Sequence, residues 1–263
     1  MDQAFYKAPR LYYPQPLGLG GGFTLEGAQH HYLKNVMRKG VGDIVRLFNP
    51  QDGEWAARIA EIGKKSLSGA VETQLRDGIE ASGAEDGANV SPPQSPRITL
   101  AFSPLPKDRM DVLVEKAVEL GVHALQPLTT EFSSVRKVND ERVTAQMVEA
   151  AEQCERMDIP VLHPLLPLTQ WIGRWTGHHP DQPVFAALER VDAAPILEVA
   201  ARYSQLDRLA FLIGPEGGFS QAEKDLLQAH SGVVAVNLGV TILRAETAAV
   251  AGIAVLSAAI RKA

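Results

Sequence analysis

The chain has 263 residues, of which 45% are hydrophobic, so it is long and apolar enough to form one large domain or two small ones. Its single cysteine, Cys154, excludes an intrachain disulfide and a zinc site built from cysteines, and is typical of a reducing compartment. The net charge of −5 argues against non-specific binding of nucleic acid. The N-terminus lacks the apolar core of a signal peptide, and no apolar stretch reaches the roughly 20 residues that span a bilayer, so we expect a cytoplasmic protein without a membrane segment.

The first 76 residues carry mainly short β-strand patterns. The patterns lie at residues 10–14, 21–26, 43–49, 54–62 and 67–75. The sequence NPQDG at residues 49–53 predicts a tight hairpin between two of these strands. Basic side chains outnumber acidic ones in this part of the chain, which weakly indicates that a polyanion binds there.

One helix is predicted among these strands, at residues 28–38. Its apolar stripe consists of Leu33, Val36 and Met37. His30, Lys34 and Arg38 are spaced by four residues and would share another face of the helix. That face is either an ordinary solvated surface or a stripe that contacts phosphates, and the spacing alone does not decide between the two.

A composition change divides the chain. Residues 77–96 are rich in Gly, Ser, Pro and acidic residues and contain almost nothing to bury, as is typical of a solvated linker. We therefore predict a first domain at residues 1–76, a linker at 77–96 and a second domain at 97–263.

The second domain alternates between strand and helix patterns. Strands are predicted at residues 97–102, 123–128, 183–188, 208–213 and 233–238, and helices at 107–120, 140–157, 195–203, 220–229 and 244–262. Apolar strands alternating with helices indicate an α/β fold whose parallel sheet is covered by helices on both faces. Ligands of such sheets bind beyond the carboxyl ends of the strands. Residues 214–219 and 238–244 follow two such ends.

The first of these ends reads LIGPEGGFSQAE, at residues 212–223. Ser220 and Glu223 form a capping box, which places the start of a helix. The three glycines before it permit positive φ angles and allow a ligand to approach bare backbone. The alternative is a tight turn between strand and helix that binds nothing.

The familiar phosphate-binding loops do not match this stretch. No lysine follows the glycines as a Walker A loop requires, and GPEGGF differs from the dinucleotide pattern G-x-G-x-x-G. Pro215 has no N–H to donate and Glu216 repels phosphate. The sequence therefore favours a ligand that lacks phosphate or carries positive charge.

A second corner of the same kind follows in VNLGVTILRAETAAV. A predicted strand ends at Leu238 and Gly239, and a helix begins near Arg244. Two such corners on neighbouring strands could form one pocket, with Arg244 and Glu246 at its edge. The alternative for this charged pair is an exposed ion pair, which contributes less than about 1 kcal/mol.

The two corners together resemble the signature of the bacterial 16S ribosomal RNA (uracil-N3)-methyltransferase family. The resemblance rests on GPEGGFS-x-x-E followed by LG-x-x-ILRAETA, and is supported by similar segments at residues 8–17, 31–43, 115–122 and 152–160. This family belongs to the SPOUT class of knotted methyltransferases. The sequence departs from the family pattern at Phe132, where an arginine is usual; Arg136 is the alternative for that role.

The resemblance implies a fold and a set of partners. The first domain would be a PUA-like β-barrel that binds RNA, and the second a SPOUT domain with a deep trefoil knot. The cofactor would be S-adenosylmethionine and the partner small-subunit ribosomal RNA, within the assembled 30S particle. The protein would be a homodimer and would use no metal.

The resemblance also implies site residues. The cofactor would contact Leu212, Ile213, Gly214, Pro215, Glu216, Gly217, Gly218, Leu238, Gly239, Ile242 and Leu243. The RNA would contact Arg10, His31, Lys34, Arg38, Arg136, Gln153 and Arg156. For Gln153 and Arg156, a pair on a helix surface is the alternative reading.

Transfer of a methyl group to N3 of uracil requires removal of the N3 proton. Glu246 and Glu216 are the carboxylates nearest the predicted pocket, and a water or a solvent hydroxide is an equal alternative as the base. Arg244 would stabilise the negative charge on the uracil carbonyl oxygens.

Two other functions compete with this hypothesis. A non-catalytic RNA-binding or ribosome-assembly protein that has kept the fold would not need both signature corners intact. An enzyme that binds a nucleotide phosphate is disfavoured because the phosphate-binding patterns are missing.

Overall fold

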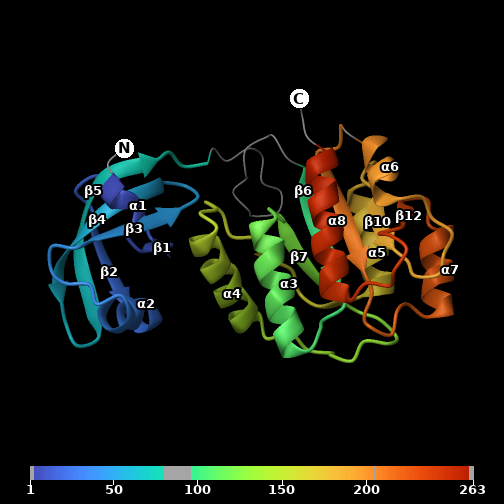
Figure 1. Ribbon diagram of the computed structural model, residues 1–263, viewed down its shortest axis with the longest axis horizontal. Coiled ribbons are helices and arrows are strands. Elements are labelled where there is room, and N and C mark those ends of the chain that lie inside the picture. Colours follow the sequence, from blue (N-terminus) through green and yellow to red (C-terminus); the bar gives the residue numbers. More distant parts are fainter. Residues whose placement is uncertain (1–2, 80–95, 204, 261–263) are drawn as a thin grey trace. The chain divides into compact units, whose positions relative to one another are not determined.

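The computed structural model describes residues 3–79, 96–203 and 205–260 (Figure 1). They form two compact units. The first contains the described residues up to 79 together with Ala151–Asp158, and the second contains the remainder. Most of the linker predicted at 77–96 lies outside the described residues, so the predicted domain boundaries stay a prediction. Ala151–Asp158 belongs to the first unit, although the sequence places it within the second predicted domain.

The first unit is built on a five-stranded sheet. A short helix, α1 (Gln3–Tyr6), precedes β1 (Arg10–Tyr12), β2 (Gly22–Glu26), β3 (Ile44–Asn49), β4 (Gly53–Ile62) and β5 (Ser66–Arg76), and the strand order is β1-β3-β4-β5-β2. The β1–β3 pair is parallel and the other pairs are antiparallel. β3 and β4 form the predicted hairpin, and Gly53 opens β4 with a φ of 89°, a conformation that glycine adopts without strain.

The sheet curls strongly but is not a closed barrel. β4 and β5 pair through three register shifts, which increase local twist, and no pairing joins β1 to β2 among the described residues. Leu33 is fully buried in the core that the curled strands enclose. The expected PUA-like barrel is therefore an open, curled sheet filled by a helical segment.

That helical segment differs from the prediction. α2 (Gly27–His31) is followed by η1 (Tyr32–Val36), a π-helix, instead of one α-helix over residues 28–38. Because a π-helix has wider turns, residues four apart no longer share a face. His30 is buried while Arg38 is exposed, and Val36 and Met37 of the predicted apolar stripe are exposed as well.

The second unit is an α/β domain, as predicted. Its strands are β6 (Arg97–Phe102), β7 (Ala124–Thr129), β8 (Val161–Leu162), β9 (Leu166–Pro167), β10 (Val184–Ala187), β11 (Arg208–Ile213) and β12 (Val233–Val236). All its strand pairs are parallel, and the order is β12-β10-β11-β6-β7-β8, with β9 beside β7. The five predicted strands correspond to the longer strands, and the two-residue strands β8 and β9 were not predicted.

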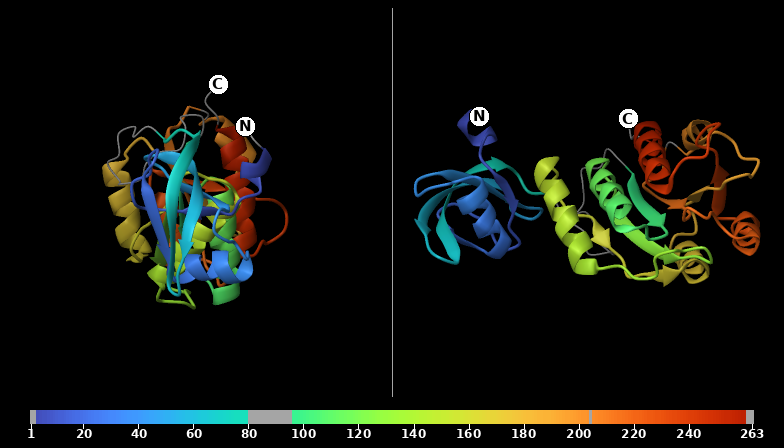
Figure 2. Two further views of the ribbon diagram at one scale, coloured as in Figure 1. Left: turned by 90° about the vertical axis from the view of Figure 1, so that its left-hand side faces the viewer. Right: turned by 60° about the horizontal axis from the view of Figure 1, so that its bottom comes forward.

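Helices cover both faces of this sheet. They are α3 (Lys107–Glu119), α4 (Asp140–Gln153), α5 (Leu168–His178), α6 (Ile196–Ala201), α7 (Gln221–Ala229) and α8 (Ala245–Ala259). α3, α6 and α8 pack together on one face, and α5 and α7 lie on the other (Figures 1 and 2). None of the described helices is long and apolar enough to cross a membrane.

α8 packs closely on the central strand β11. Gly252 faces the ring of Phe211, and a Cβ at this position would overlap that ring. On the opposite side of the helix Thr247, Ala254 and Ala258 are exposed. α8 is therefore buried on one side only, although most of its residues are apolar. The strand pairings do not decide how the loops thread, so the trefoil knot stays a prediction.

Candidate active site

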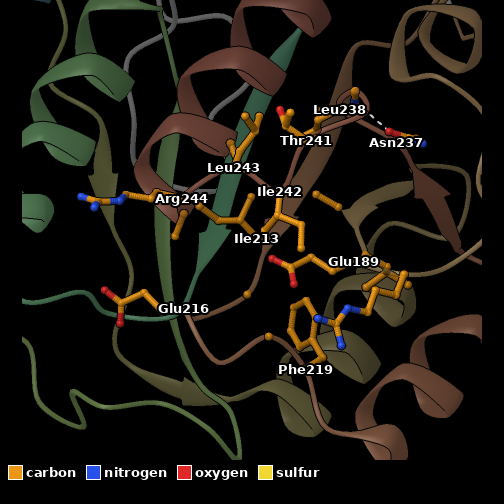
Figure 3. A pocket seen from close by; sticks show the side chains of 18 of the residues that line it. Glu189, Ile213, Glu216, Phe219, Asn237, Leu238, Thr241, Ile242, Leu243 and Arg244 are labelled. Carbon is orange, nitrogen blue, oxygen red and sulfur yellow. Dashed lines mark hydrogen bonds between the residues drawn. The ribbon is translucent and has the colours of Figure 1, made fainter.

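A cavity of about 690 Å³ lies at the carboxyl ends of β10, β11 and β12, beside the first turn of α8 (Figure 3). β10 lies between the other two strands, and its last residue, Ala187, pairs with Ile213 on one side and Val236 on the other. The two corners are therefore not on neighbouring strands, as was expected, but on the two strands that flank β10, and the loop after β10 starts between them. The cavity is lined by residues 187–191, 213–216 and 236–245, together with Arg109, Gly218, Phe219 and Ala248.

The loop after β11 is held by its own residues. The Ser220 hydroxyl accepts a hydrogen bond from the Glu223 N–H at 3.3 Å, and the Glu223 carboxylate accepts one from the Ser220 N–H at 2.9 Å, so the predicted capping box is present at α7. Gly218 has a φ of 70° and donates its N–H to the Pro215 carbonyl at 2.8 Å. The loop is thus a tight turn whose bare backbone faces the cavity.

The loop after β12 forms the second wall. Gly239 has a φ of 135°, a conformation that L side chains rarely adopt, and it donates its N–H to the Asn237 side-chain oxygen at 2.7 Å. Val240 and Ile242 are exposed although both are apolar. Two glycine-containing corners thus meet at one space and present backbone and apolar side chains to it.

Most of the residues expected to bind a cofactor line this cavity, and two do not. Leu212 is fully buried in the hydrophobic core of the domain. Gly217 lies instead beside Phe132, because a Cβ at position 217 would be 3.1 Å from that of Phe132. Phe132 is half exposed, and its loop is tied to the start of α7 by a 2.9 Å hydrogen bond from the Glu131 N–H to the Glu223 carboxylate.

The three candidate catalytic residues have different surroundings. Arg244 and Glu216 both line the cavity and lie at the same end of it (Figure 3). The Glu216 carboxylate is paired with Arg109, a residue of α3, and each side chain of this pair is about one-third exposed. Glu246 does not line the cavity; its Oε2 atom is buried and has no hydrogen-bond partner among the described residues.

Three charged residues on the cavity wall were not predicted. Arg109 comes from the first turn of α3, and Glu189 and Arg190 come from the loop after β10. Arg190 has a φ of 58°, which is uncommon for a residue with a side chain. The signal was available in part: the predicted strand at 183–188 also has a carboxyl end, and charged residues follow it directly.

Arg10, one of the expected RNA contacts, is not at the surface. Its guanidinium is buried, donates to Glu54 at 3.0 Å and to the carbonyl oxygens of Ala151 and Arg156 at 2.8 Å each, and lies 3.4 Å from the centre of the Phe48 ring. Burial lowers the pKa of Arg10, and the Glu54 carboxylate opposes this effect. The geometry assigns Arg10 to holding the segment Ala151–Asp158 within the first unit.

Arg156 and Gln153, the two expected RNA contacts within that segment, differ in their exposure. Arg156 makes a two-pronged ion pair with the buried Asp158, at 2.7 and 2.8 Å. Gln153, the last residue of α4, is exposed. Only Gln153 of this pair presents its side chain openly to solvent.

The remaining expected RNA contacts lie at the surface. His31 and Arg38 are exposed, and Lys34 is half-buried, donating to the carbonyl oxygen of Gly63 at 2.8 Å. Arg136, in the second unit, is half-buried and donates to the carbonyl of Glu131 at 3.4 Å. Within the described ranges, no group of three or more His, Cys, Asp or Glu residues could hold a metal ion.

The sequence matches two family models and several named proteins. The family model described as an RNA methyltransferase domain matches residues 92–257, and that of an RNA methyltransferase PUA domain matches residues 25–72. A protein of Rickettsia conorii named ribosomal RNA small subunit methyltransferase E is 32% identical over 94% of each chain. A protein of the same name from Synechocystis is 30% identical over 98% of this chain and 80% of its own.

Solved structures agree over nearly the whole length. A protein of Legionella pneumophila, whose structure is in complex with the bound cofactor SAM, matches with a TM-score of 0.78 and 26% identity, over 98% of this chain and 100% of the other. A ribosomal RNA small subunit methyltransferase E of Neisseria gonorrhoeae bound to S-adenosyl methionine matches with a TM-score of 0.75 and 27% identity, over 94% and 95% of the two chains.

Proposed function

Because the chain belongs to the RNA methyltransferase family, we propose that it transfers a methyl group from S-adenosylmethionine to N3 of a uridine in 16S ribosomal RNA. The observation that carries the proposal is the cavity formed by loops from three adjacent parallel strands, which contains both signature corners. A non-catalytic RNA-binding protein would have no use for such a cavity.

The cavity suits this cofactor on physical grounds. Its volume of about 690 Å³ is within the range of small-molecule sites, roughly 300–1,000 Å³. Bare backbone at Gly214, Gly218 and Gly239 can meet the edges of a flat heterocycle, and Ile213 and Phe219 offer apolar contacts. When bound, S-adenosylmethionine supplies an electrophilic methyl group.

The protein's own residues must then position the uracil and remove its N3 proton. Alignment of the reacting atoms can contribute about 7 kcal/mol or more to lowering the barrier. Arg244 lies on the cavity wall, where its guanidinium can stabilise negative charge on the uracil carbonyl oxygens.

We favour Glu216 over Glu246 as the base. A general base must reach the proton that it removes, and Glu216 lines the cavity whereas Glu246 does not. The ion pair of Glu216 with Arg109 is partly exposed, and such pairs contribute only about 1 kcal/mol or less, so an incoming uracil can displace Arg109 with little loss.

The RNA would be bound by both units. His31, Lys34 and Arg38 would each contact the RNA from the first unit, and Arg136 and Gln153 would add polar contacts elsewhere. Arg10 and Arg156 would contribute by fixing the segment that carries Gln153. The substrate would be the ribosomal RNA within the 30S particle, the enzyme would act in the cytoplasm, and the mechanism would need no metal.

A homodimer is also part of the proposal. The side of α8 that faces away from the sheet exposes only small residues, among them Ala254 and Ala258. Val240 and Ile242 are exposed in the neighbouring loop. These residues would pack against a second copy of the chain, and a molar mass of twice 28.4 kDa by light scattering is the expected result.

The test is mass spectrometry of nucleosides from 16S ribosomal RNA of a strain that lacks this gene. We expect 3-methyluridine to be lost and to return when the purified protein and S-adenosylmethionine are added to 30S particles. Persistence of 3-methyluridine at the wild-type level would show that the target is wrong. If calorimetry showed no binding of S-adenosylmethionine, the non-catalytic function would be favoured instead.

A further inference from the structure

The loop after β10 brings a carboxylate into the cavity that the mechanism above does not use. Glu189 lines the cavity, and its side chain points inward, in view between Ile242 and Phe219 (Figure 3). It makes no ion pair or hydrogen bond with any residue that the structure describes.

The other charged groups of the cavity are distributed differently. Glu216, the second carboxylate on the wall, is paired with Arg109 at the opposite end, next to Arg244. Arg190, the next residue of the same loop, also lines the cavity but forms no ion pair with Glu189 among the described residues, so the Glu189 carboxylate is not engaged by a cation of the protein. A ligand that fills the cavity would bring its own groups to this carboxylate.

The surroundings of Glu189 strengthen its attraction for a cation. Glu189 is itself exposed in the structure, and the apolar side chains of Ile213, Phe219 and Ile242 shield it from water only once a ligand fills the space, which would then lower the local dielectric constant. A Cβ added to Gly218 would lie only 3.9 Å from the Glu189 Oε2 atom, so the glycine leaves room beside the carboxylate. An anionic or phosphate-bearing ligand would be repelled at this position.

We propose that Glu189 recognises the positive charge of the cofactor and thereby selects a cationic ligand for this cavity. The inference rests on the proposed function, because S-adenosylmethionine carries two cationic groups, its sulfonium and its α-ammonium. A charge-assisted contact of this kind corresponds to roughly a tenfold change in affinity.

A neutral role is the physical alternative. A carboxylate can also accept hydrogen bonds from the two ribose hydroxyls of an adenosine, and that contact would not depend on ligand charge. The two roles separate with 5′-methylthioadenosine, which has the adenine, the ribose and the sulfur but neither cationic group.

The experiment is titration calorimetry of the full chain with S-adenosylmethionine, S-adenosylhomocysteine and 5′-methylthioadenosine. The variants are Glu189→Gln, which keeps size and shape, and Asp192→Asn, which removes the same charge from an exposed position of the same loop that does not line the cavity. A melting temperature near that of the wild type shows that each variant is folded.

For Glu189→Gln we expect about tenfold weaker binding of S-adenosylmethionine and unchanged binding of 5′-methylthioadenosine, and no change for Asp192→Asn. A loss with S-adenosylmethionine alone assigns the contact to the sulfonium, and an equal loss with S-adenosylhomocysteine assigns it to the ammonium. Unchanged S-adenosylmethionine binding, or an equal loss for all three ligands, overturns the inference. Failure of the wild type to bind S-adenosylmethionine would instead overturn the proposed function.

Discussion

Each signature corner contributes one glutamate, Glu216 in the loop before α7 and Glu246 in the first turn of α8, and their surroundings differ. Glu216 reaches the cavity, and Glu246 is partly buried beside it. We predict that Glu216→Gln lowers the single-turnover rate of methyl transfer by about 10²–10⁴-fold, the usual contribution of a general base. Glu246→Gln should lower it less than tenfold, since the amide keeps the shape. Rapid-quench measurements with saturating cofactor give the single-turnover rates of both variants. A larger loss for Glu246→Gln than for Glu216→Gln would identify Glu246 as the base.

The cluster around Glu54 predicts a stability effect at a residue far from the cavity. The Glu54 carboxylate is almost fully buried and accepts from Arg10 and Arg46, both buried, at 3.0 Å, and from Arg76. Glu54→Gln leaves buried guanidinium charge uncompensated and should destabilise the protein by about 3–5 kcal/mol. Urea unfolding of the wild type and of Glu54→Gln measures this difference in the free energy of unfolding.

The control for that change is Glu72→Gln, which breaks the exposed ion pair of Glu72 with Arg58. That change should leave the free energy of unfolding nearly unchanged, because water and salt screen the exposed pair. Equal effects at the two positions would mean that the buried cluster is no more important than a surface pair.

The role of a single residue could be predicted from the sequence only where its partners are close in the chain. The capping box of Ser220 and Glu223 could be read directly, because it depends on a spacing of three residues. The role of Arg10 could not, because its partners Glu54 and Ala151 are distant in the chain. Arg109 and Glu189 join the cavity only through the strand order of the sheet, which periodicity does not encode.

Packing between α8 and β11 makes the replacement of Gly252 by alanine differ in its effect on stability from the same replacement at Gly173 in α5. Replacing glycine by alanine in a helix normally stabilises by up to about 1 kcal/mol. In α8, however, the added methyl of Gly252→Ala would overlap the Phe211 ring, so we expect destabilisation by about 1–3 kcal/mol. Gly173→Ala in α5 meets nothing within 4 Å and should raise the melting temperature. Calorimetric melting of the two variants tests the contrast, and stabilisation by both would contradict it.

Elements with a strong apolar pattern were predicted well, and the misses have physical causes. The buried strands of the second unit stand out as runs of aliphatic residues. α5 was missed because its two glycines weaken helix propensity, although Leu168, Trp171, Ile172 and Trp175 follow helical spacing and are all buried. That helix ends at His178, and His179 is its C-terminal cap. The π-helix after α2 has no period that the sequence pattern could reveal.

The attachment of Ala151–Asp158 to the first unit predicts a pH dependence for the whole molecule. Arg46 donates to the Glu155 carboxylate at 2.7 Å, and this hydrogen bond lowers the pKa of Glu155 in the folded protein. Because the folded pKa is depressed, the contribution to stability is complete above the unfolded pKa and is lost as the pH falls through the folded value. The gap in unfolding free energy between wild type and Glu155→Gln should therefore shrink on acidification from pH 6 to pH 3. A gap that widens over this range would contradict the assignment.

The same segment means that the N-terminal unit is not one continuous piece of sequence. Arg10, Arg46 and Arg76 each bond to groups of residues 151–156, which belong to a part of the chain more than seventy residues further on. Recombination that exchanged residues 1–76 for those of another protein would leave these arginines facing a foreign peptide. The unit keeps these hydrogen bonds only if both segments are exchanged together. We therefore expect substitutions in residues 1–76 and in residues 151–158 to be correlated among related sequences.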